Sequence, residues 1–165
     1  MLLDLLQQVA MKTSKLLLIS TFLFNSTLIK SESPAEESIE MTVYRSPTCT
    51  CCGKWLEHVN NHHYVIKDII SDDMQAIKQR FGVPDKLASC HTAIVEGYVI
   101  EGHVPAEDIK KLLHGKPKVS GLSAPGMPLG SPGMEMGNQK NHYETVTFDK
   151  EGNVKFFAEH GKSGP

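Results

Sequence analysis

Residues 41–60 read MTVYRSPTCTCCGKWLEHVN and contain the pattern that decides the fold. Strand-forming residues predict a short strand over 41–45, which Ser46-Pro47 ends. Apolar residues at helical spacing predict a helix over 53–61. Three cysteines therefore fall between a strand and a helix start, where free N–H groups and the helix dipole stabilise thiolates.

The rest of the chain continues this alternation of strands and helices. We expect a strand over 64–70, a helix from its cap at 71–73 to about Phe81, strands over 92–95 and 98–100, a helix from Pro105 to Leu113, and a final hairpin over 145–158. This order predicts an α/β fold with a small mixed sheet flanked by helices. It fits a thioredoxin-like layout, with the cysteines before the first helix.

A long segment rich in Gly, Pro and Met, residues 115–138, interrupts this order before the hairpin. Such loops in compact domains are usually functional or disordered. Its Gly and Pro residues argue against a helix or a central strand. We expect residues 121–136 to fold over the cysteines as a lid.

Length and charge limit the class of protein. The chain has 165 residues, 40% of them hydrophobic, and a formal net charge of -2. These values fit one domain, which we place at 41–160. No cluster of basic residues provides the electrostatic surface that nucleic acid requires, so nucleic-acid binding is excluded.

The N-terminus has the pattern of an export signal. Lys12 and Lys15 precede an apolar run over 16–24, which is short for a membrane span. We predict a signal peptide over 1–30 with the true start at Met11, a linker over 31–40, and a periplasmic location. The poor cleavage site leaves an uncleaved membrane anchor as an alternative.

The cysteine spacing favours chemistry over architecture. Cys49, Cys51 and Cys52 lie within four residues, and a bond between adjacent cysteines is strained and closes no useful loop. Cys49 and Cys52 have the C-x-x-C spacing of a redox pair. Soft thiolates also favour Cu(I) and zinc. Copper, zinc, a dithiol redox pair and structural disulfides all remain open at this point.

Further candidate ligands lie outside this group. Cys90 and His91 precede a predicted strand, at the place that faces the first helix in a thioredoxin-like layout, and His103 follows the next strand. Met134 and Met136 offer thioethers, which prefer Cu(I). Flexible exposed methionines and ordinary surface histidines are the alternatives.

Several motifs in order carry a resemblance to a known family. They are PTCTCCGKW (47–55), SCHTA (89–93), GYVIEGHVP (97–105), APGMP (124–128) and GSPGMEM (130–136). With these CxCC-containing motifs the chain resembles the CopG-type envelope metal-binding proteins. That family is found with copper-resistance determinants and was long described only as a domain of unknown function.

This resemblance implies a thioredoxin-like fold and copper handling in the periplasm. We therefore predict a periplasmic copper-binding protein that serves copper resistance. It would bind Cu(I), as one ion or several, with zinc as the competing metal, and would work beside other envelope copper-handling proteins. The alternative is a thiol-disulfide or copper oxidoreductase that uses Cys49 and Cys52, so the sequence leaves enzymatic activity undecided.

Overall fold

The structure is a computed structural model that describes residues 38–161. Its elements in chain order are β1 (Ile39–Arg45), α2 (Thr50–Asn60), β2 (Tyr64–Ile70), α3 (Met74–Arg80), the 3-10 helix η1 (Asp85–Leu87), β3 (His91–Val95), β4 (Tyr98–Glu101), α4 (Ala106–Gly115), β5 (Gly121–Ser123), β6 (Tyr143–Phe148) and β7 (Val154–His160).

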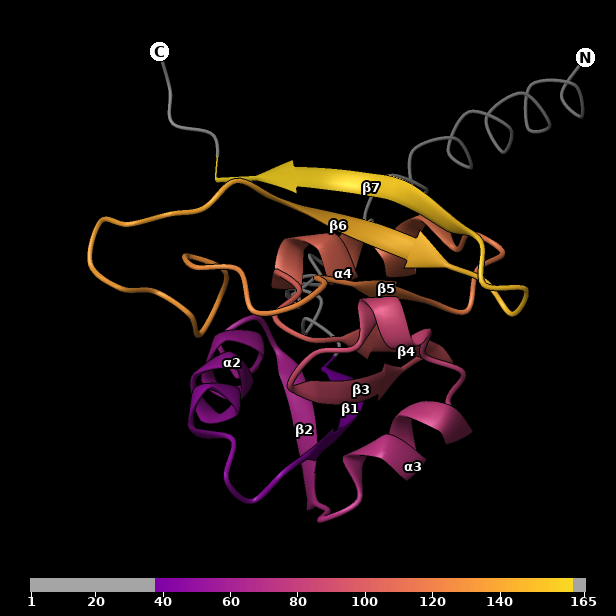
Figure 1. The fold of residues 1–165 in the computed structure, drawn as a ribbon, viewed down its shortest axis with the longest axis horizontal. Coiled ribbons are helices and arrows are strands. Elements are labelled where there is room, and N and C mark those ends of the chain that lie inside the picture. Colours follow the sequence, from indigo (N-terminus) through magenta and orange to yellow (C-terminus); the bar gives the residue numbers. More distant parts are fainter. Residues whose placement is uncertain (1–37, 162–165) are drawn as a thin grey trace, which may run out of the picture. The chain divides into compact units, whose positions relative to one another are not determined.

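One mixed sheet organises these elements (Figure 1). Its strand order is β2-β1-β3-β4-β5-β6-β7. β1 and β2 are parallel and are joined through α2, while β4 and β5 are parallel and are joined through α4. The remaining neighbours are antiparallel. The α/β class and the mixed sheet are thus confirmed. The thioredoxin-like label stays an interpretation of the element order.

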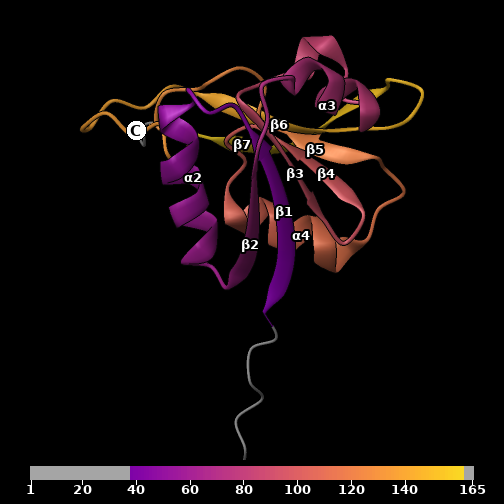
Figure 2. The same cartoon turned by 90° about the horizontal axis from the view of Figure 1, so that it is seen from below.

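Side-chain alternation along β3 and β4 divides the buried groups between the two faces of the sheet. Ala93, Val95 and Ile100 join the main core, to which α2 contributes Trp55 and Val59, and α4 contributes Ile109 and Leu112. Ile94 and Val99 belong to a second cluster on the other face. Figure 2 shows α3 across the sheet from α4.

The predicted loop over 115–138 is wrong in one part. Residues Gly121–Ser123 form β5, a central strand between β4 and β6. Glycine permits this strand, because a Cβ at Gly121 would overlap the Val99 carbonyl and lie 2.8 Å from the Phe148 ring. The sheet therefore includes the C-terminal hairpin and is larger than the small sheet expected from the sequence.

The N-terminal predictions fall mostly outside the described residues. The signal segment and the linker up to residue 37 are not described, whereas Ile39 and Glu40, placed in the linker, belong to β1. Among residues 38–161, no helix is long and apolar enough to cross a membrane.

The C-terminal hairpin is fastened to α4 by one buried carboxylate. Asp108 of α4 accepts hydrogen bonds from Thr145 Oγ1 of β6 and His160 Nε2 of β7, each at 2.7 Å. The Asp108 side chain is fully buried, so these bonds replace the water that it loses on folding.

Candidate metal centre

The first turn of α2 presents the cysteines. The helix begins at Thr50 with Cys49 as its N-cap, three residues earlier than the sequence predicts. A turn positions Cys49, whose N–H donates to the Ser46 carbonyl at 3.2 Å. Cys51 and Cys52 therefore belong to the helix, and the partial positive charge of its N-terminus stabilises a thiolate at this end.

Two of the four cysteines are joined. Cys49 and Cys52 form a disulfide with a Cα–Cα distance of 5.5 Å, while Cys51 and Cys90 are free thiols. The C-x-x-C pair that the sequence offers as a redox pair is thus the pair that is bonded. Cys52 is fully buried behind it.

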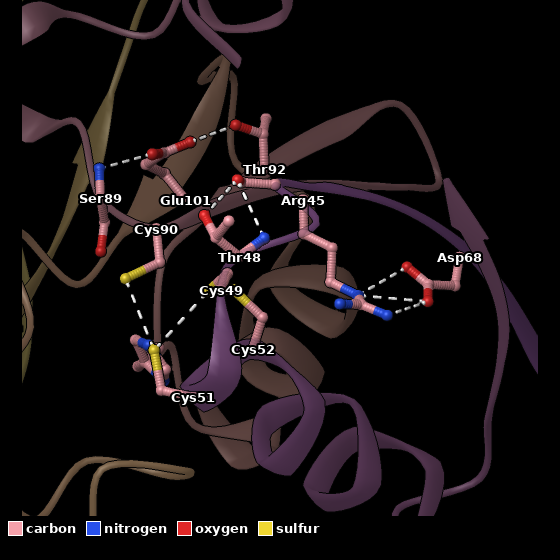
Figure 3. The surroundings of a disulfide bond; sticks show 12 residues. Arg45, Thr48, Cys49, Cys51, Cys52, Asp68, Ser89, Cys90, Thr92 and Glu101 are labelled. Carbon is pink, nitrogen blue, oxygen red and sulfur yellow. Dashed lines mark hydrogen bonds and ion pairs between the residues drawn. A yellow bond between two sulfur atoms is a disulfide. The ribbon is translucent and has the colours of Figure 1, made fainter. Parts of the chain in front are cut away.

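The remaining sulfurs lie against this disulfide (Figure 3). The Sγ atom of Cys51 is 3.6 Å from that of Cys49 and 3.7 Å from that of Cys90. The three sulfurs all lie within 4.8 Å of one another. Among the described residues, this is the group of His, Cys, Asp and Glu that could hold a metal ion. Its donors are soft sulfurs, which suit Cu(I) or zinc.

Cys90 enters this group from the segment before β3. Burial raises the pKa of the Cys90 thiol to about 11, and the hydrogen bond and charge of Cys51 act in the same direction. The charge of Lys78 and the Ser89 side chain oppose this shift. At neutral pH Cys90 is therefore protonated, and a metal that binds there displaces its proton.

His91 and His103 form a buried pair beside Trp55. The His91 ring lies 4.2 Å from the Trp55 ring and 5.0 Å from the His103 ring, measured between centroids. His103 Nδ1 donates to the Pro132 carbonyl at 2.8 Å, but His103 Nε2 and both nitrogens of His91 have no partner. The structure does not bring either histidine into the three-sulfur group.

Burial keeps both histidines neutral. It lowers the pKa of His91 well below 6.5, and the nearby charges of His103 and Lys78 lower this pKa further. Burial also lowers the pKa of His103, while the Pro132 carbonyl acts in the opposite direction. Neutral imidazole is the form that binds metals.

The second half of the Met-rich segment lies against the first turn of α2. Gly133 packs closely there, because a Cβ on it would lie 2.8 Å from the Trp55 backbone nitrogen and 3.1 Å from the Cys51 carbonyl oxygen. Met134 and Met136 line a cavity of about 370 Å³ together with Cys51. The structure thus brings both methionines to the cavity beside Cys51.

A buried charged network, not predicted from the sequence, lies behind Cys90. The Glu101 carboxylate is fully buried and accepts hydrogen bonds from Lys78 Nζ, the Ser89 N–H and Thr92 Oγ1. The sequence contains one indication of this network. Glu101 directly follows the apolar residues 98–100 and lies on the same face of the strand as Val99. A charge at such a position requires a partner.

Comparisons with known proteins agree with this geometry. Residues 87–134 match the family described as protein of unknown function, DUF411. Two solved structures, described as copper resistance protein CopG in Form 1 and Form 2, are 40% and 39% identical to the chain. In both matches the alignment covers 76% of this chain and 100% of the other, with a TM-score of 0.72. The chain belongs to the CopG family.

Membership in the CopG family confirms the resemblance found in the sequence motifs. The copper-resistance description of these relatives and the cysteine group fit a copper-related function and a sulfur-based metal site. A comparison with curated protein sequences gave no match.

Proposed function

We propose that this protein binds copper as Cu(I) through the thiolates of Cys49, Cys51, Cys52 and Cys90. The observation that carries the proposal is the convergence of three sulfurs within 4.8 Å of one another. Thiolates this close repel one another as bare anions, and a bound cation relieves that repulsion. A structural role alone does not explain why two free thiols lie beside a disulfide.

Full use of the four cysteines requires reduction of the Cys49–Cys52 disulfide. An external thiol reductant supplies two electrons, two protons are taken up, and two thiols form. Copper then displaces the thiol protons as it binds. The buried unpartnered nitrogens of His91 and His103 and the thioethers of Met134 and Met136 support their assignment as additional ligands. More than one ion per chain is part of the proposal, and zinc is the competing metal.

The proposal extends to the place and partners of this activity. We assign the protein to the periplasm, where it would serve copper resistance beside other envelope copper-handling proteins. The motif of two lysines before a short apolar run supports this location. Membrane attachment would follow only from an uncleaved signal segment.

Metal loading tests the proposal directly. Fully reduced protein is titrated anaerobically with Cu(I), in parallel with protein that keeps the Cys49–Cys52 disulfide and with Cys90→Ser. We expect about one copper or more per reduced chain, because three or four soft thiolates suffice for such a site. Uptake should be lower in the other two samples. Less than one copper per chain, with no further decrease in Cys90→Ser, would contradict the proposal. If the protein retains zinc in preference to copper, zinc is the metal of this site.

A second function, oxidoreductase activity, is favoured by the disulfide at the start of α2. Cys49 and Cys52 have the redox spacing, and the sulfur of Cys51 lies 3.6 Å from that of Cys49. In a copper reaction, the reduced Cys49–Cys52 dithiol would give two electrons to two Cu(II) ions. The products would be the Cys49–Cys52 disulfide, two Cu(I) ions and two released protons. In a thiol exchange, the Cys49 thiolate would attack a partner disulfide and release one partner thiolate. Cys52 would then attack the Cys49 sulfur of the mixed disulfide, which releases the second partner thiolate and forms the Cys49–Cys52 disulfide.

An insulin-reduction assay on metal-free protein separates the two functions. Activity that is lost in Cys49→Ser and unaffected by copper chelators would establish thiol exchange. Absence of such activity, combined with stoichiometric copper binding, would leave copper as the ligand or the redox partner.

A further inference from the structure

The strongest feature outside the cysteine group is the buried ion pair behind Cys90. Glu101 Oε1 lies 2.5 Å from Lys78 Nζ and accepts the Ser89 N–H at 2.6 Å, while its Oε2 accepts from Thr92 Oγ1 at 2.7 Å. Lys78 Nζ also donates to Thr92 Oγ1 at 3.1 Å. Figure 3 shows Glu101 between Ser89 and Thr92, with Cys90 next to Ser89.

This carboxylate holds the chain on both sides of Cys90 and His91. Ser89 is the residue before Cys90, and Thr92 is the second residue after it. Ser89 is held from a second direction, since its hydroxyl donates to the Gly126 carbonyl. Gly102 allows the close approach, because a Cβ there would lie 2.5 Å from Ser89 Oγ. The backbone that carries the Cys90 sulfur is therefore fixed by Glu101 and its surroundings.

Stability alone is a weak reason for such an arrangement. A buried ion pair costs much of what it gains through the loss of hydration, and apolar residues of similar volume often serve as well. The second face of the sheet buries apolar side chains such as Val99, Leu87 and Phe148. A charged group on that face is better explained by what it orients, namely Ser89 and Thr92 on either side of Cys90 and His91.

We propose that Glu101, paired with Lys78, is a positioning residue that holds the Cys90 sulfur against that of Cys51. The copper part of this inference rests on the proposed function, whereas the sulfur geometry does not. In the disulfide form Cys51 and Cys90 are the two free thiols of the chain. Their proximity can therefore be measured without metal.

The test is cross-linking of these two thiols by a short bifunctional thiol reagent, dibromobimane. The variants are Glu101→Ala, the double variant Lys78→Met/Glu101→Gln, and Asp108→Asn as a matched control. Asp108 is an equally buried carboxylate whose partners Thr145 and His160 lie outside the cysteine group. Cys90→Ser shows the background of the reaction.

We expect the intramolecular step to be slower by about tenfold or more in Glu101→Ala, since a displacement near 1 Å in reacting geometry costs up to about 100-fold. The double variant should recover most of the rate, because the Gln oxygen still accepts the Ser89 N–H and no buried charge is left unpaired. Asp108→Asn should react like the wild type. A wild-type rate in folded Glu101→Ala would overturn the proposal.

If Glu101→Ala does not fold, Thr92→Val tests the positioning role. This variant removes the hydrogen bond from Thr92 to Glu101 and should slow the intramolecular cross-linking step about fivefold, the factor for one ordinary hydrogen bond. An unchanged rate would overturn the proposal.

A copper titration gives the second arm. Glu101→Ala should weaken Cu(I) binding about tenfold or more, and this effect should vanish in a Cys90→Ser background, as coupling between neighbours requires. An equal loss in both backgrounds would overturn the role at Cys90. If the wild type binds no copper, the proposed function fails, and the cross-linking rates still decide the positioning role.

Discussion

Glu101 and His91 are both fully buried, but only Glu101 has hydrogen-bond partners for its side chain. The carboxylate of Glu101 is satisfied by three donors, whereas neither ring nitrogen of His91 has a partner. Buried polar atoms nearly always have a partner, and an unpaired one costs about 1–3 kcal/mol. We therefore expect the unpaired nitrogens of His91 to serve a purpose other than stability.

His91→Phe tests this interpretation. Phenylalanine keeps an aromatic ring next to Trp55 and removes the two unpaired nitrogens. We expect the free energy of unfolding of metal-free protein to stay equal or to rise by up to about 2 kcal/mol. Cu(I) affinity should fall by about tenfold or more if a ligand is lost, which corresponds to about 1.4 kcal/mol. Chemical denaturation and competitive Cu(I) titration measure the two quantities.

The control for this substitution is His114→Gln, at an exposed histidine near the end of α4. It should change neither quantity. If His91→Phe destabilises the fold and leaves copper affinity untouched, His91 is a packing residue and should be removed from the ligand set.

At the level of elements, β5 shows how a local rule can be overridden by packing. Gly121 looks like a loop residue in sequence, because glycine is unfavourable in strands. In the sheet it is required, since it lies against the Val99 backbone and the Phe148 ring. Leu122 beside it is fully buried in the main core. A three-residue strand with one apolar side chain gives no periodic signal.

Gly121→Ala should therefore be strongly destabilising. The added methyl group cannot fit beside the Val99 carbonyl without moving a central strand, so we expect a loss of about 3 kcal/mol or more. Urea denaturation measures it.

Gly53→Ala is the matched control. Gly53 is exposed in α2, and an added methyl group there would have no neighbouring atom within 4 Å. Alanine at this position should stabilise the protein by about 0.5–1 kcal/mol, because it favours the helix. Equal effects at the two glycines would show that β5 is not a packed central strand.

Most other elements could be predicted, because their signals are local. The strand over 64–70 coincides with β2, and Asp73 caps α3 by accepting the Ala76 N–H at 2.9 Å. The start of α2 could not be predicted. Cysteines have low helix propensity, and only the turn at Ser46 shows that the helix includes Cys51 and Cys52.

For the molecule as a whole, the Met-rich segment connects the sheet with the cysteine group. Its first part is fixed in β5, so the lid expected over 121–136 is not one movable unit. Beyond β5, its contacts include the hydrogen bonds of the Ser89 hydroxyl to the Gly126 carbonyl, of His103 to the Pro132 carbonyl and of the Asn141 N–H to the Leu129 carbonyl. The convergence of Gly133 and Cys51 is a long-range contact, which no local pattern in the sequence specifies.

Copper should therefore order the part of the segment after β5. We expect amide hydrogen exchange over residues 124–136 to slow when Cu(I) binds to reduced protein, because the thioethers of Met134 and Met136 would hold the segment down. The double variant Met134→Ala/Met136→Ala should lose this protection and bind Cu(I) about tenfold more weakly. Exchange measured by mass spectrometry gives the first quantity.

Met127→Ala serves as the control, since Met127 is exposed in the same segment and does not line the cavity beside Cys51. It should behave like the wild type. Identical exchange with and without copper, together with unchanged affinity in the double variant, would remove the methionines from the site.

Trp55, the single tryptophan of the chain, lies between the cysteine helix, the buried histidines and the Met-rich segment. It is fully buried, its indole N–H donates to the Val104 carbonyl at 2.9 Å, and its ring contacts His91. Its backbone also lies close to Gly133 of the Met-rich segment. The tryptophan emission of the whole protein consequently originates from one indole beside the cysteine helix turn. The molecule thus carries its own optical probe, which needs no label and has no second indole whose signal must be subtracted.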